Sequence, residues 1–312
     1  ATRAHKSMAD VGFLKGPVAE LEAALSQPQK LDSEYQRVNQ ETSTEAFFAS
    51  RGGFVSALKP ENRRKNRYSN ILPFENSRVE LPSLDEDATD YVNANWVKGS
   101  DFGCPYSYIC CQGPLDTTIC DFWRMVLETK SRVVVMLTRE MEAAQEKCSV
   151  YWETSKYPHV EVRLEATDHP GPSIVRRKLC ISRPGGADAL HVTQLQFIAW
   201  PDFGVPASAT PILQLMRLTE EVAGEPDAPL VVHCSAGVGR SGSFVTCHVL
   251  LSRLEAAIKS HTPIPDPVSV PRIVRRLRDF RVLLVQKKDQ YRFCFEAVLE
   301  GAKYIATSGR YI

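Results

Sequence analysis

The sequence predicts an α/β protein of the α+β type, with one domain built on a mixed sheet flanked by helices. Short apolar runs that suit buried strands lie at 92–97, 106–110, 133–137 and 228–234. Two segments with alternating polarity, 160–166 and 191–200, suit half-buried antiparallel strands. Amphipathic helical segments separate these runs and fill the chain after residue 207. A sheet with helices on its faces buries both kinds of element.

The predicted helices follow in chain order. Residues 17–27 form a short amphipathic helix with Pro17 near its start, where a proline is tolerated. Residues 30–66 are polar and lead into a basic run at 63–67, which we interpret as a solvated surface; a nuclear-import signal is the alternative. The other helices are expected at 117–130, 211–224, 241–260, 269–280 and 290–306.

Composition excludes several classes of protein. Hydrophobic residues make up 43% of the 312 residues, which argues against a disordered or fibrous chain. The net charge is +1, so no overall field favours a nucleic-acid partner, and none is expected. No apolar run approaches the roughly 20 residues of a membrane span. The first ten residues lack a hydrophobic signal core, so we expect a cytoplasmic protein. We also expect a monomer.

Nine cysteines are scattered along the chain. None of them forms the paired C-x2-C spacing of a zinc site, and we expect no metal and no cofactor. In a reducing compartment most cysteines are buried small apolar residues. The remaining question is whether one of them is a nucleophile.

The segment HCSAGVGRSG at 233–242 is the strongest chemical signal. A buried strand leads to Cys234, a loop with Gly237 and Gly239 follows, and a helix begins near Ser241. Such a layout aims successive backbone amides and a helix N-terminus at one point, which makes an anion cradle beside the thiol. Arg240 adds a planar fork that suits two phosphate oxygens and a field that favours the thiolate.

Spacing alone is weak evidence, because Cys247 and Arg253 are also six residues apart. That second pair has no glycine between its members and lies inside a predicted helix, so its side chains point away from each other. Only Cys234 has the strand, the glycines and the helix start together.

Several blocks of the sequence, in order, resemble the tyrosine-specific protein tyrosine phosphatases, in particular their single-domain intracellular branch. HCSAGVGRSGSF resembles the phosphate-binding loop, WPDFGVP at 200–206 the general-acid loop, and KNRYSNILPFENSRVEL at 65–81 the phosphotyrosine-recognition segment. DYVNANWVKG, YICCQGPL, DFWRMV, KCSVYW and VQKKDQYRF resemble further blocks, so that the likeness covers residues 60–305. The resemblance implies a central, highly twisted sheet. We expect a catalytic domain at 56–312 after a helical extension at 1–55, and we give residues 1–7 no role in the fold.

The resemblance implies a reaction and assigns roles. Cys234 would attack the phosphorus atom and form a phosphocysteine, without a metal. Asp202 would be the general acid and then the base; its alternative is an ordinary turn residue. The equatorial phosphate oxygens would be held by Arg240 and by the loop amides of Ser235, Ala236, Gly237, Val238 and Gly239.

Supporting roles follow from the same resemblance. Gln286 matches the glutamine that orients the hydrolytic water, and Gln290 a second supporting glutamine. Ser241 matches the hydroxyl that stabilises the departing thiolate; it also reads as a helix N-cap. The other supporting positions are Glu142, which matches a partner of the arginine, Lys147, which matches a lysine facing the acid loop, Trp200 at the start of that loop, and His233. Glu142 and Lys147 could equally be solvated charges.

Substrate selection is expected from the depth of the pocket. Tyr68 matches the residue that stacks on the phosphotyrosine ring and makes the site too deep for phosphoserine; a half-buried packing role is the alternative. Asn70 stands where many relatives have Asp, which predicts a weaker grip on the substrate backbone. Leu283 stands where some relatives have Gly, which predicts a closed second aryl-phosphate site. Lys287 replaces the usual Thr. The expected partners are tyrosine-phosphorylated proteins.

Three other functions compete with this one. A catalytically dead binding module is disfavoured because Cys234, Arg240 and Asp202 are all present. A lipid or mixed-specificity phosphatase is disfavoured because the loop contains no lysine. A redox enzyme that uses the vicinal Cys110 and Cys111 would leave Asp202 unexplained.

Overall fold

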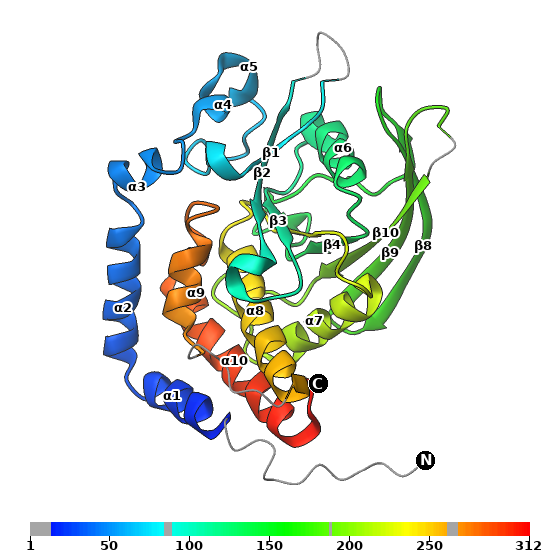
Figure 1. Ribbon diagram of the computed structural model, residues 1–312. Helices are drawn as coiled ribbons and strands as arrows, with labels where there is room; N and C mark the ends of the chain where they lie inside the picture. Colours follow the sequence, from blue (N-terminus) through cyan, green and yellow to red (C-terminus); the bar gives the residue numbers. More distant parts are fainter. Residues whose placement is uncertain (1–13, 84–88, 187–188, 261–267) are drawn as a thin grey trace, which may run out of the picture.

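The computed structural model describes residues 14–83, 89–186, 189–260 and 268–312, so the expectation for residues 1–7 lies outside the described residues. A nine-stranded sheet runs through the centre, with helices on both faces (Figure 1). Its order is β1-β2-β3-β11-β4-β10-β9-β8-β7. The strands β3, β11, β4 and β10 are parallel neighbours, and the remaining pairs are antiparallel. The predicted mixed sheet is confirmed.

The strands of this sheet are β1 (Arg78–Glu80), β2 (Tyr91–Val97), β3 (Tyr108–Cys111), β4 (Val133–Met136), β7 (Ser155–Lys156), β8 (Glu161–Gly171), β9 (Ile174–Ser182), β10 (Ala189–Phe197) and β11 (Leu230–His233). A separate hairpin pairs β5 (Met141–Glu142) with β6 (Gln145–Glu146). The helices are α1 (Lys15–Leu25), α2 (Pro28–Glu41), α3 (Glu45–Ala49), α4 (Val55–Leu58), α5 (Pro60–Arg63), α6 (Ile119–Glu128), α7 (Thr210–Ala223), α8 (Gly239–Ser260), α9 (Val270–Leu277) and α10 (Lys288–Ser308). Short 3-10 turns lie at Glu75–Ser77, Gly99–Phe102 and Asp116–Thr118.

The sheet has a hydrophobic core on each face. Val133 and Val135 of β4 join the cluster under α7, α8 and α10, whereas Val134 and Met136 join the cluster under α6. Because side chains alternate along a strand, a central strand with both faces covered is apolar at every position. This explains the continuous apolar runs at β4 and β11. Strand β11 ends at His233, and the loop with Cys234 begins directly after it.

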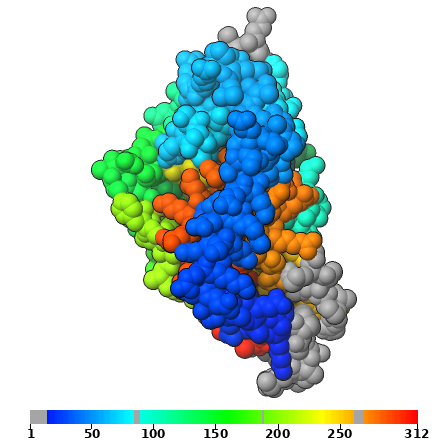
Figure 2. Space-filling view, turned by 90° about the vertical axis from the view of Figure 1, so that its left-hand side faces the viewer, coloured from blue at the N-terminus to red at the C-terminus, as the bar shows by residue number. Residues whose placement is uncertain are grey.

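The N-terminal region contains helices that the polar pattern of 30–66 did not predict, within and just after the helical extension expected at 1–55. The stretch 30–66, interpreted as polar, contains α2 and the short helices α3 to α5. Helix α2 buries only Leu31, Tyr35 and Val38, and apart from Pro28 its other side chains are polar. Figure 2 shows α1 and α2, in blue, lying along the orange and red C-terminal helices. Tertiary packing rather than a strong apolar pattern therefore stabilises this helix.

Five strands were also missed, namely β1, β5, β6, β7 and β9, and β5, β6 and β7 have only two residues each. Strand β1 has three residues, too few for a pattern. Strand β9 carries Arg176, Arg177 and Lys178 in succession, which interrupts its alternation. The half-buried Arg177 lies 4.1 Å over the Trp152 ring and donates to Gln194 and Gln196 of β10, so the structure accommodates its charge. No helix in the described part of the chain combines the length and apolarity of a bilayer crossing.

Candidate active site

Cys234 follows the central strand β11 and begins a tight loop that ends at the first turn of α8. Carbonyl groups of this loop are hydrogen-bonded to the surrounding protein. His233 Nδ1 lies 3.1 Å from the Cys234 carbonyl, and Gly113 N donates to the Ser235 carbonyl at 2.9 Å. Val285 N donates to the Val238 carbonyl at 3.0 Å. The carbonyls of Ala236 and Gly237 each accept from Arg281 at 3.0 Å.

These bonds orient the loop amides. In a trans peptide the N–H points opposite to the C=O of the same unit. When the carbonyls of 234–238 are held outward, the amides of 235–239 are left facing the space beside Cys234. One of them already binds the sulfur, since Gly237 N lies 3.3 Å from Cys234 Sγ. The loop is therefore an anion cradle with a thiol at its base.

Gly237 is required for this loop. Its φ is +70°, in the left-handed region, and an added Cβ would lie 1.9 Å from the Cys111 carbonyl oxygen on β3. Any side chain would therefore push the loop away from the sheet. Close packing of the loop against β3 is the reason for glycine here.

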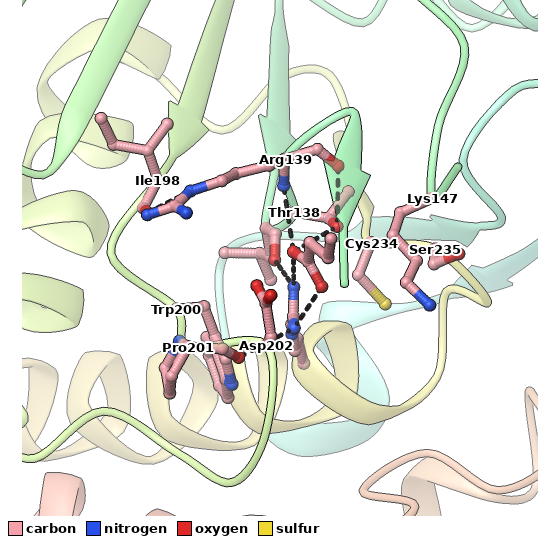
Figure 3. A network of polar contacts seen from close by, with 12 residues as sticks. Thr138, Arg139, Lys147, Ile198, Trp200, Pro201, Asp202, Cys234 and Ser235 are labelled. Carbon is pink, nitrogen blue, oxygen red and sulfur yellow. Dashed lines mark hydrogen bonds and ion pairs between the residues drawn. The ribbon is translucent and has the colours of Figure 1, made fainter. Parts of the chain in front are cut away.

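Arg240, in the first turn of α8, connects the cradle to its surroundings. Its Nη1 and Nη2 donate to Glu142 Oε1 and Oε2 at 2.6 and 2.8 Å, a bidentate pair. They also donate to the carbonyls of Leu137 and Pro201, each at 3.1 Å. Figure 3 shows these bonds linking α8, the loop after β4 and the segment that begins at Trp200. The guanidinium is therefore held in one orientation.

Glu142 is buried and remains ionised. Burial alone would raise its pKa, but the hydrogen bonds and charge of Arg240 hold the pKa of this carboxyl below its usual range. The Arg139 amide and the Thr138 hydroxyl, at 3.2 and 2.9 Å, act in the same direction. Its alternative as a solvated charge is wrong, because the side chain is buried and paired.

The segment with Asp202 faces the cradle from the side, with Trp200, Pro201 and Asp202 opposite Cys234 and Ser235 (Figure 3). Asp202 is exposed, and its Oδ2 accepts from Ala143 N at 3.0 Å. Trp200 is buried, and Arg240 Cζ lies 5.7 Å from the centroid of its ring. Its Nε1 donates to the Gly204 carbonyl at 3.2 Å. The buried indole anchors the segment, and the tip with Asp202 and Phe203 faces solvent.

Tyr68 reaches the cradle from a different part of the chain. Its hydroxyl lies 2.9 Å from Ser235 Oγ. The neighbouring Arg67 is fixed through its amide to Gln112 Oε1 at 2.9 Å and through Nε to the Gly113 carbonyl at 3.1 Å. The ring therefore forms a wall of the pocket.

Together these elements enclose a cavity of about 390 Å³. Twelve of the residues singled out from the sequence line it: Tyr68, Asn70, Glu142, Lys147, Asp202, Cys234, Ser235, Ala236, Gly239, Arg240, Gln286 and Gln290. Lys287 also lines it. Residues 220 positions apart in the sequence thus meet at one site.

Five of the singled-out residues support the cavity from behind it. These are Gly237 and Val238 in the loop, the buried Trp200 and His233, and Ser241. Helix α8 begins at Gly239, so Ser241 lies within its first turn and the N-cap alternative is wrong. The Ser241 hydroxyl is buried and has no hydrogen-bond partner among the described residues.

Lys147 lies at the rim. It lines the cavity together with Asp202, and its ammonium group donates to Gln145 Oε1 at 2.9 Å on the β5–β6 hairpin. Gln290 is buried and accepts from the Lys287 amide at 3.1 Å through Oε1, which caps α10.

Arg281 was missed by the sequence reasoning. It is fully buried behind the loop, where it donates to the Ala236 and Gly237 carbonyls and to Asn93 and Asn95 of β2 at 2.7 and 2.8 Å. Burial lowers the pKa of this guanidinium. Four arginines lie close together in RRLRDFR, and no sequence signal separates this one from the others.

The surroundings of His233 fix its tautomer. A carbonyl can only accept, so Nδ1 carries the proton toward the Cys234 carbonyl, and Nε2 then accepts from the Tyr151 hydroxyl at 2.6 Å. Burial lowers the pKa of His233 to about 4.

This neutral histidine predicts a loss of stability in acid. The unfolded chain binds a proton near pH 6.5 and the folded chain only near pH 4, so stability is lost as the pH falls through this window. This pKa shift corresponds to a decrease on the order of 3 kcal/mol in the free energy of unfolding. Urea titrations between pH 7 and 4 measure it. His233→Asn, which retains an amide donor near Nδ1, should show a smaller decline, and equal declines would contradict the assignment.

One group of residues with metal-ligand geometry occurs in the described part of the chain. It comprises Glu165 of β8, Cys180 of β9 and His191 of β10, whose ligand atoms lie within 4.8 Å of one another. None of the three lines the cavity with Cys234.

Comparison with known proteins agrees with the fold and the site. The family model for protein-tyrosine phosphatase matches residues 62–300. The chain is 39% identical over 261 residues to human tyrosine-protein phosphatase non-receptor type 20, and 38% identical over 250 residues to human receptor-type tyrosine-protein phosphatase C. These alignments cover 82% and 78% of this chain, but 59% and 18% of the relatives.

A solved structure gives the same result. The catalytic domain of human protein tyrosine phosphatase non-receptor type 18 superimposes with a TM-score of 0.78 at 32% identity, covering 89% of this chain and 98% of that one. The expected fold is therefore confirmed. The chain belongs to the protein-tyrosine phosphatase family.

Proposed function

We propose that this protein hydrolyses phosphotyrosine in proteins through a phosphocysteine intermediate. The observation that carries the proposal is the cradle of outward-held carbonyls, with Cys234 at its base and Arg240 at its side. Such a cradle stabilises the three equatorial oxygens of a phosphoryl group during its transfer.

The proposed reaction has two steps. In the first, the Cys234 thiolate attacks phosphorus, the bond to the tyrosyl oxygen breaks, and the Asp202 carboxyl gives that oxygen its proton. In the second, Gln286 orients a water, which attacks phosphorus while its proton passes to the Asp202 carboxylate. The phosphorus–sulfur bond breaks, inorganic phosphate forms, and the Ser241 hydroxyl stabilises the thiolate that leaves.

The same cradle supports a reaction without a metal or another cofactor. Loop amides and Arg240 supply the positive field that a metal ion supplies in other phosphatases. Glu142 keeps Arg240 aimed at the cradle, and Lys147 faces the acid segment.

The location and partners form a further part of the proposal. All nine cysteines are free thiols in the structure, which suits the reducing cytoplasm. We propose that the protein acts there as a monomer in signalling, on tyrosine-phosphorylated proteins. Residues 56–312 would form the catalytic domain and residues 1–55 a helical extension.

The depth of the pocket predicts selectivity. A phosphoserine side chain is shorter than phosphotyrosine, so the wall formed by Tyr68 should keep its phosphate away from Cys234. Tyr68→Ala should lower the ratio of kcat/KM for phosphotyrosine over phosphoserine peptides by about two- to tenfold, the range of a lost aromatic contact. Matched peptide pairs measure this ratio, and Tyr157→Ala is a control in a half-buried tyrosine outside the cavity lining. An unchanged ratio would refute the depth argument.

Turnover of a phosphopeptide panel in EDTA tests the proposal as a whole. We expect phosphate release from phosphotyrosine peptides at the same rate with and without the chelator. A requirement for added metal, or a preference for phosphoserine peptides, would overturn it.

A further inference from the structure

We infer that helix α2 is a positioning element for the second step, and that the Tyr35 hydroxyl fixes the backbone that carries Gln286. The inference rests on the proposed function, because it assigns Gln286 to the hydrolytic water. It gives the N-terminal helices a part in the reaction, although they contribute no side chain to the cavity lining.

The segment before Gln286 has an unfavourable backbone. Leu283 and Val285 have φ values of +57° and +60°, in the left-handed region. A β-branched residue such as valine rarely adopts it, and such a conformation persists only where the surroundings impose it. The position of Gln286 therefore depends on the groups that hold this segment.

Three groups hold the segment. The first is the cradle itself, where the Val238 carbonyl accepts from Val285 N at 3.0 Å. The second is Arg278, which donates to the carbonyls of Leu284 and Val285 at 3.0 and 2.9 Å. The third is Tyr35 of α2, whose hydroxyl donates to the Gln286 carbonyl and lies 3.4 Å from the Val285 carbonyl.

Helix α2 and its C-cap residue also bind Arg278, the second of these groups. Asn39 Oδ1 and the Thr42 hydroxyl accept from Arg278 Nη1 at 2.7 and 2.9 Å. Tyr35, Asn39 and Thr42 are spaced i, i+4 and i+7, so they lie on one face of the helix. This face therefore fixes the Gln286 segment twice, directly through Tyr35 and indirectly through the buried Arg278.

A second set of contacts fixes α2 to the helix that follows Gln286. The rings of Tyr35 and Tyr291 of α10 are 5.3 Å apart, and the Tyr291 hydroxyl donates to Glu34. Lys288 lies 3.1 Å from Asp32. Figure 2 shows α2 lying along these C-terminal helices. Gln286 therefore lies between two anchors that α2 supplies.

The two chemical steps should respond differently to the loss of this contact. The first step uses Cys234, Arg240 and Asp202, and none of them bonds to Tyr35. The second step needs a water that Gln286 holds in line with phosphorus. A looser Gln286 backbone should therefore slow breakdown of the phosphocysteine and leave its formation unchanged.

Rapid mixing of Tyr35→Phe with p-nitrophenyl phosphate separates the two steps. The burst of nitrophenolate reports formation of the phosphocysteine, and the steady state reports its hydrolysis, because nitrophenolate is a good leaving group. We expect an unchanged burst rate and a three- to tenfold lower steady-state kcat, the usual range for one hydrogen bond. Phenylalanine keeps the ring packing, and equal melting temperatures would show that the fold is intact.

Two comparisons make the test specific. Tyr311→Phe removes another buried tyrosine hydroxyl, which donates to Glu220 and contacts neither α2 nor the Gln286 backbone, so it should leave both rates unchanged. In a Gln286→Ala background, Tyr35→Phe should add no further effect, because contacts that act through one group are not additive.

Equal slowing of both steps, the same change in Tyr311→Phe, or additivity with Gln286→Ala would each overturn the inference. Failure of the proposed function looks different, since the wild-type protein would then release no nitrophenolate at all.

Discussion

Cys234→Ser is expected to lower phosphotyrosine hydrolysis by about 10⁵-fold or more, the range seen when a nucleophile is removed from a catalytic group that acts as a unit. A serine hydroxyl is not ionised near neutral pH, so no anionic nucleophile remains in the cradle. The loop amides and Arg240 persist in this variant, so it should still bind phosphotyrosine peptides. Steady-state phosphate release measures the first effect, and calorimetric titration measures the second.

Cys247→Ser is the matched control for this variant. Cys247 is another buried cysteine, followed by an arginine at the same spacing, but it lies inside α8 and faces the core. Cys247→Ser should lower the melting temperature of the protein and leave kcat nearly unchanged. Retained turnover in Cys234→Ser would sink the proposed mechanism.

Asp202→Ala should lower kcat for phosphotyrosine peptides by about 10²–10⁴-fold, the usual contribution of a general acid. The tyrosyl oxygen is a poor leaving group without a proton, so the first step should slow most. A substrate whose leaving phenol is acidic needs less protonation, and its kcat should fall less. The measurement is a comparison of kcat across aryl phosphates with graded leaving-group pKa.

Asp227→Ala serves as the control, because Asp227 is exposed before β11 and pairs with Arg132 at 3.3 Å, outside the cavity lining. If Asp202→Ala lowered kcat equally for every leaving group, Asp202 would not be the acid. Its effect would then come only from the hydrogen bond that it accepts from the Ala143 amide, which holds its segment in position.

A structural feature could be predicted from the sequence wherever one short, continuous segment contains all the residues that form it. The strand, glycine loop and helix at 233–242 lie in one continuous stretch, so the cradle could be recognised before any contact was known. The apolar runs of β4 and β11 predicted a buried sheet for the same reason, since covering both faces leaves no polar position. The order of the family blocks predicted the fold, and the comparisons confirm it. The roles of the individual site residues stay predictions.

Other features depend on contacts between distant segments, and these could not be read from the sequence. Helix α2 has a mostly polar surface, and its place is determined by packing on α9 and α10. Arg281 looks like its neighbouring arginines until the fold buries it behind the loop carbonyls.

What the sequence determined alone was the fold class, the family and the cradle with Cys234, because these follow from patterns within continuous segments. The tertiary structure decided which charged and polar groups hold that cradle in place, namely Glu142 on Arg240, Arg281 on the loop carbonyls and Tyr35 on the Gln286 backbone. The physical reason is that a buried polar group must find a hydrogen-bond partner, and only the folded chain determines which distant group supplies it.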